Sequence, residues 1–135
     1  MSLQEQVLSD DRRGAAWAKE RLLQRVQYLP EVDRAMMQII LSGRASQREI
    51  AAARKEQPGT ICRRIRRLVT ALHHPIVVAL TERGNELRPE MRQLGIEHFL
   101  HRRSPRELAE YHEMSLRKVR QMLDWVRGWA AGVGK

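Results

Sequence analysis

The sequence contains one short pattern twice, 58 residues apart, and this repeat limits the possible folds more than any other feature. SQREIA begins at Ser46, and SPRELA begins at Ser104. In both, Ser is followed three residues later by Glu, which is the capping box found at helix N-termini. The same offset aligns the apolar residues that follow, so we predict two copies of one supersecondary unit. The aligned apolar pairs are Ile50 with Leu108, Ala51 with Ala109, Ile61 with Val119, and Ile65 with Leu123.

Apolar residues recur at three- and four-residue steps along most of the chain, and this spacing predicts an all-α fold. We expect three helices in each copy and one further helix before the first copy, capped by Ser9, Asp10 and Asp11. The stretch 76–80 is too short to classify by its period, so a short strand and a buried helical turn both remain open. The predicted division is an N-terminal helix for docking or dimerisation (1–29), a first three-helix unit (30–74), a linker (75–88), a second unit (89–130) and a frayed tail (131–135).

Each copy resembles a helix-turn-helix, and the first is similar to the promoter-reading C-terminal region of bacterial sigma factors. The resemblance rests on EIA at 49–51 and on TICRRIRRL at 60–68. In that family a supporting helix with Glu-Ile-Ala is followed, about ten residues later, by Thr-Val and a basic recognition helix that enters the DNA groove. The resemblance implies that Lys55 and Glu113 occupy the turn position that is usually Gly. A non-glycine residue with left-handed backbone costs about 1 kcal/mol there.

The charge balance favours a polyanionic partner. Lys and Arg number 25 against 16 Asp and Glu, and the formal net charge is +9. Residues 44–67 contain eight basic and two acidic side chains, a net +6, whereas residues 102–127 contain seven and four, a net +3. Aromatic residues make up only 4% of the chain, which disfavours the base-stacking surfaces that bind RNA or single strands. We therefore expect double-stranded DNA as the partner.

The candidate DNA-binding residues lie mainly on the second and third helices of each copy. In the first copy, basic side chains lie opposite an apolar stripe and could reach phosphates and guanine edges. An ordinary solvated helix face is the alternative there, and a packing or dimerisation role is the alternative for the second copy. The predicted contacts are Arg44, Arg48, Thr60, Arg63, Arg64, Arg66 and Arg67 in the first copy, and Ser115, Arg117, Lys118, Arg120 and Gln121 in the second.

The favoured function is a sequence-preferring DNA-binding protein, acting as a transcriptional regulator or sigma-like accessory factor in the cytoplasm and nucleoid. The alternative is an interaction module that binds RNA polymerase or another transcription factor, with the N-terminal helix as a docking or homodimer element. Residues 1–33 favour this alternative because their five basic and six acidic side chains nearly cancel.

Several classes of protein are not expected. No Gly-rich phosphate loop or catalytic constellation occurs, so we predict no enzyme activity and no cofactor. Cys62 is the single cysteine, and the histidines lack a third ligand at suitable spacing, so we predict no metal site. No apolar run approaches the roughly 18 residues of a membrane span, and we expect no membrane association.

Overall fold

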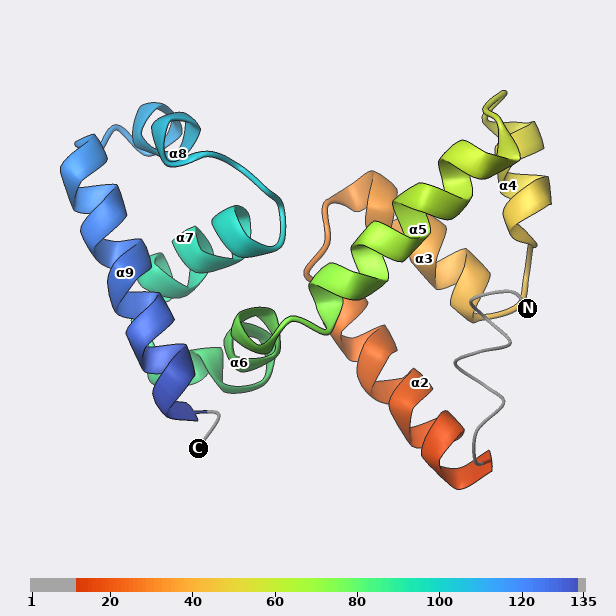
Figure 1. Cartoon of the computed structure of the whole chain (residues 1–135), viewed down its shortest axis with the longest axis horizontal. Helices are drawn as coiled ribbons and strands as arrows, with labels where there is room; N and C mark the ends of the chain where they lie inside the picture. The colour runs from red at the N-terminus through yellow and green to blue at the C-terminus, as the bar shows by residue number, and fades with distance from the viewer. Residues whose placement is uncertain (1–11, 134–135) are drawn as a thin grey trace. The chain divides into compact units, whose positions relative to one another are not determined.

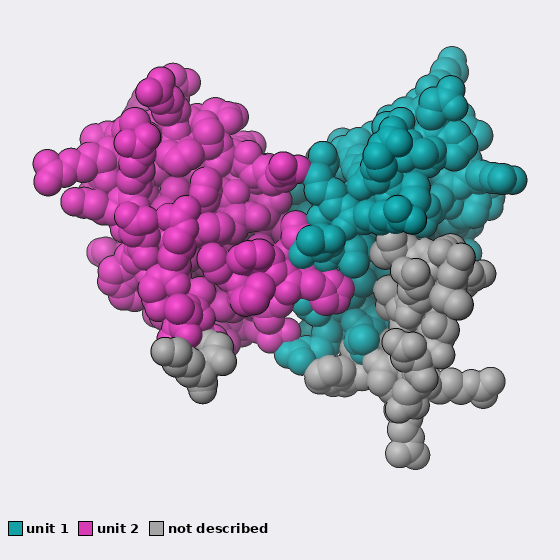
Figure 2. All heavy atoms as spheres, in the orientation of Figure 1, with its two compact units in different colours: residues 1–70 teal, residues 71–135 magenta. Residues whose placement is uncertain are grey.

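The computed structural model describes the backbone of residues 12–133 and the side chains of residues 18–133 (Figure 1). This part of the chain forms eight α-helices and one 3-10 helix and contains no strand, which confirms the all-α prediction. The chain divides into two compact units, residues 1–70 and residues 71–135, coloured separately in Figure 2. We call them unit 1 and unit 2.

Unit 1 contains the N-terminal helix and the first copy of the repeat. The N-terminal helix packs on the helix that follows it. Its predicted cap at 9–11 lies outside the described residues. The apolar faces point inward, and Leu22, Met37, Ile61 and Ile65 are among the largest fully buried side chains. The helices are α2 (Arg12–Val26), α3 (Glu31–Leu41), α4 (Gln47–Ala53) and α5 (Pro58–Leu72).

Unit 2 is organised around its long last helix, which packs against the three other α-helices of the unit. Leu94, Leu108, Val119 and Leu123 form a buried cluster at the centre of this packing. Phe99, Ala109, Met114 and Met122 are partly buried and pack against that cluster. The elements are α6 (Pro75–Arg83), the 3-10 helix η1 (Gly84–Glu86), α7 (Pro89–Phe99), α8 (Pro105–Tyr111) and α9 (Leu116–Val133).

The helix bounds follow the 58-residue offset seen in the sequence. α3, α4 and α5 begin 58 residues before α7, α8 and α9, respectively. Both predicted capping boxes form. The Glu49 N–H donates to Ser46 Oγ at 3.1 Å, and the Ser46 N–H donates to Glu49 Oε1 at 3.2 Å. Ser104 and Glu107 make the same two bonds at 3.1 Å each, so α4 and α8 begin by the same local mechanism.

The turns after α4 and α8 also match. Lys55 and Glu113 have φ angles of 55° and 53°, which is the left-handed backbone expected at these two positions. The next residue in each turn donates its N–H back to the helix, from Glu56 to the Ala51 carbonyl in unit 1, at 2.9 Å. Met114 makes the equivalent bond in unit 2, also at 2.9 Å. This is the Schellman pattern that ends a helix with a left-handed residue.

The predicted linker (75–88) is corrected, and of the two alternatives left open for 76–80 the structure shows the helical one. Residues 75–83 form helix α6, which packs on α7 and α9. His74 Nδ1 accepts the Ile76 N–H at 3.2 Å, and Pro75 occupies the first helical position, so the sequence has a start signal for a helix here. Burial of Val77 and Leu80 at a three-residue spacing then favours a helix over a strand.

Over residues 12–133, each unit therefore has four α-helices, one more than the three predicted for each copy of the repeat. α6 precedes α7 as α2 precedes α3, and both helices pack on the helix that follows. Buried leucines are also 58 residues apart in the two units: Leu22 corresponds to Leu80, and Leu29 corresponds to Leu87. The predicted frayed tail is also corrected, because α9 remains helical through Val133. Residues 134 and 135 lie outside the described part of the chain.

The second capping box provides a test of local stability. The Ser104 N–H and hydroxyl lower the pKa of Glu107 below its ordinary range. A lowered folded-state pKa means that this carboxylate stabilises the fold above its unfolded-state pKa, and that the contribution is lost as the pH falls through the folded-state pKa. We expect Glu107→Gln to flatten the acidic part of the stability profile, and Ser104→Ala to cost about 1 kcal/mol at neutral pH. Urea unfolding at several pH values measures both, and a parent-like profile for Glu107→Gln would contradict this account.

Candidate nucleic-acid interface

The exposed face of α5 is strongly basic. Arg63, Arg66 and Arg67 are exposed, and α5 contains no acidic residue. Within the described residues none of the three has an ion-pair partner, although Arg63 Nη2 donates to Thr60 Oγ1 at 3.4 Å. The opposite face of α5 is the buried stripe of Ile61, Ile65, Leu68 and Leu72. Packing of that stripe holds the three guanidinium groups toward solvent.

Arg64 has a different environment from its neighbours. Its Nε donates to Asp33 Oδ1 at 2.8 Å, and the two side chains are 29% and 15% exposed. The pair joins α5 to α3. The structure thus places Arg64 in a contact that orients the basic helix, whereas the other predicted residues of unit 1, including Arg44, Arg48 and Thr60, are exposed.

The turn before α5 is held by polar contacts as well. Arg54 Nε lies 3.4 Å from Glu56 Oε1, and Arg54 Nη1 donates to Met36 Sδ at 3.6 Å. The sequence interpretation did not assign this role to Arg54, Glu56 or Asp33. A signal was present in the repeat, because Glu56 and Arg64 replace Met114 and Met122 of the second copy. Where one copy has a charged residue and the other copy has an apolar one, the charged residue is expected to pair with a residue of opposite charge.

The corresponding face of α9 combines basic residues with uncharged polar ones. Ser115, Arg117, Lys118, Arg120 and Gln121 are all exposed, as the prediction for these residues requires. The Ser115 hydroxyl accepts the Lys118 N–H at 3.1 Å and therefore caps α9.

Helix α9 lacks arginine at two positions where α5 has it. At the 58-residue offset, Arg66 and Arg67 correspond to Asp124 and Trp125. Asp124 Oδ1 accepts a hydrogen bond from Arg127 at 2.8 Å, which also neutralises one basic side chain of α9. Trp125 is 55% exposed. The basic face is therefore stronger in unit 1 than in unit 2.

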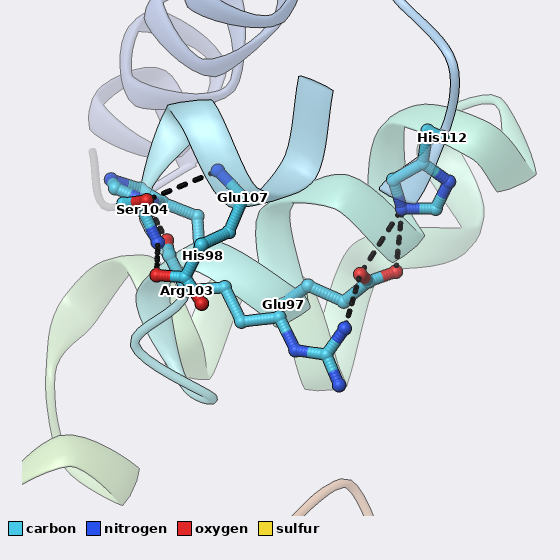
Figure 3. A network of polar contacts seen from close by, with 6 residues as sticks. All are labelled: Glu97, His98, Arg103, Ser104, Glu107 and His112. Carbon is cyan, nitrogen blue, oxygen red and sulfur yellow. Dashed lines mark hydrogen bonds and ion pairs between the residues drawn. The ribbon is translucent and has the colours of Figure 1, made fainter. Parts of the chain in front are cut away.

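A buried carboxylate braces the turn before α9. Glu97 on α7 is only 4% exposed, and both of its oxygens lie 3.1 Å from His112 Nε2. Arg103 Nη1 lies 3.8 Å from Glu97 Oε2. Figure 3 shows the carboxylate between the His112 ring and the Arg103 guanidinium. The contact links α7 to the end of α8.

These features define a class of structure: over residues 12–133, an α-helical fold in which an arrangement of four α-helices occurs twice, with an arginine-rich helix face in unit 1. No family model, curated protein or solved structure matches the chain. Over residues 12–133, no helix has the length and apolar character required to cross a bilayer. The same part of the chain brings together no group of three or more His, Cys, Asp or Glu side chains suited to a metal ion.

Proposed function

We propose that the chain binds double-stranded DNA, with α5 as the main contact. One observation carries this proposal: Arg63, Arg66 and Arg67 are exposed on one acid-free helix and have no ion-pair partner among the described residues. Unpaired arginines on a surface repel one another, and this cost is offset when phosphates neutralise them.

The short helix α4 and the turn that follows it position α5 in a way that is compatible with its entry into a DNA groove. α4 and α5 are joined by a tight turn with left-handed Lys55, and the Asp33–Arg64 pair fixes α5 on α3. In this arrangement α4 crosses the DNA backbone while the N-terminal half of α5 reaches base edges. Arg63 suits bidentate binding of guanine, and Arg44 and Arg48 suit phosphate contacts that set the register.

In this proposal the biological role is transcriptional regulation, as a repressor, activator or sigma-like accessory factor. Selection of bound sequences from random duplex DNA tests that finer assignment. Enrichment of one motif supports a regulator, and uniform binding supports an architectural protein. Absence of binding rejects the proposed function.

The salt dependence of DNA binding directly tests the proposed contacts between basic side chains and phosphates. We expect a plot of log affinity against log salt concentration to have a slope near −5, because roughly six phosphate contacts release their condensed counterions. Fluorescence anisotropy of a labelled duplex at several salt concentrations measures the slope. A slope near zero would contradict a phosphate-binding α5.

A protein partner is the second candidate, and exposed aromatic side chains favour it. Tyr111 is 70% exposed and Trp125 is 55% exposed, both in unit 2. Tyrosine and tryptophan supply much of the binding energy at protein interfaces. RNA polymerase, another transcription factor or a second copy of the chain would then contact α8 and α9 while α5 contacts DNA.

A further inference from the structure

Unit 2 contains an open groove. It has a volume of about 640 Å³ and lies between the start of α7, the α8–α9 turn and the first half of α9. This volume is in the range of small-molecule sites, roughly 300–1,000 Å³. Leu94, Met114 and Met122 supply its apolar lining. Methionine side chains adapt their shape readily to an apolar ligand.

The polar residues of the groove carry a positive balance. Arg88 and Lys118 line it, and Glu90 is its one exposed acid. Neither cation has an ion-pair partner among the described residues. His112 also lines the groove, but its Nε2 is bonded to the buried Glu97 carboxylate. Two unpaired cations beside an apolar surface match a ligand that has an anionic head and an apolar body.

Comparison of the two units shows that two of the groove-lining positions differ between the copies. At the 58-residue offset, Met114 corresponds to Glu56 and Met122 corresponds to Arg64. In unit 1 these two residues are charged and paired, with Arg54 and Asp33 respectively. The same helix order therefore forms with charges at both positions. In unit 2, Met114 and Met122 pack against the buried cluster and also line the groove, so part of each side chain is available to an apolar ligand.

We propose that this groove binds a small amphipathic carboxylate. The apolar body of the ligand lies on Met114, Met122 and Leu94, and its carboxylate binds the side chains of Arg88 and Lys118. This site is independent of the proposed DNA contact by α5 and adds a small-molecule ligand to unit 2.

Decanoate below its micellar concentration is the probe, and methyl-labelled methionine is the reporter. The chain has six methionines, of which Met114 and Met122 line the groove. We expect saturable NMR shifts of these two methyl groups, with the Met36 and Met37 methyls of unit 1 unchanged. Decanol and decylamine are the neutral and cationic controls, and both are expected to bind more weakly than decanoate.

Two matched substitutions test the role of charge. Lys118→Gln and Arg88→Gln should each weaken decanoate binding about threefold to fivefold, as for a partly exposed ion pair. Arg106→Gln removes the same charge from an exposed site outside the groove and should leave binding unchanged. Met122→Ala, which removes part of the apolar lining without changing the charge, should also weaken binding. Methyl shifts of residues outside the groove verify that each variant is folded.

Three results would overturn the proposal. One is the absence of a saturable shift at Met114 and Met122. Another is equal binding of decanoate, decanol and decylamine, which would show partition without recognition of an anion. The third is an equal effect of decanoate on the unit 1 methionines, which would show a detergent-like action. DNA binding by α5 is measured separately, so failure here leaves the proposed function standing.

Discussion

Replacing Arg63 and Arg66 with Ala is expected to weaken duplex binding about 10- to 100-fold and to reduce the salt slope by about one for each phosphate contact that is lost. Both guanidinium groups are exposed on α5 and are available to phosphates or base edges. Loss of two such contacts corresponds to about 1.4–2.8 kcal/mol of binding free energy. Fluorescence anisotropy titrations at several salt concentrations measure the affinity and the slope together.

The control is Arg117→Ala with Arg120→Ala, which removes the same charge from α9. We expect a smaller loss of affinity, because Asp124 and Trp125 lie on α9 where α5 has Arg66 and Arg67. Thermal melts come first, since arginine side chains also cover apolar surface. If the α9 pair proved more damaging, α5 would not be the main DNA-binding helix.

Ala51→Leu is expected to destabilise the fold by about 1–3 kcal/mol, because the new side chain has no space. Ala51 is 1% exposed and lies one residue after buried Ile50 on α4. Its repeat partner Ala109 is only partly buried against the unit 2 cluster, so Ala109→Leu should cost less. Chemical unfolding of both variants measures the difference.

Ala52→Leu is the matched control for this pair. Ala52 is on the same helix and is exposed, so a leucine there should change stability by less than about 0.5 kcal/mol. A parent-like stability of Ala51→Leu would show that α4 does not pack closely at this position.

Local features of the structure were largely predictable from the sequence. The two capping boxes and the left-handed turn residues Lys55 and Glu113 depend on contacts within about five residues. The spacing of Ile61 and Ile65 likewise identified the buried side of α5. The exposed Arg63, Arg66 and Arg67 follow from that same periodicity, so most of the candidate interface could be named in advance.

The segment 75–88 shows where local reasoning failed. Its apolar run is short, and a strand and a helix bury such a run equally well. The predicted copies of the repeat begin at Pro30 and Pro89, whereas the 58-residue offset continues upstream of both. The buried pair Leu22 and Leu80, at the 58-residue offset, would have identified α6 as the counterpart of α2.

The sequence alone thus determined the helical class, the repeat, the starts of α4 and α8 and the basic face of α5, because short-range periodicity and capping specify them. Only the tertiary structure decided how side chains distant in sequence meet. It paired Arg64 with Asp33, placed the Glu97 carboxylate against His112, and left a groove lined by Met114 and Met122. These contacts join residues on different helices, and their formation depends on how the helices pack, which a one-dimensional pattern does not specify.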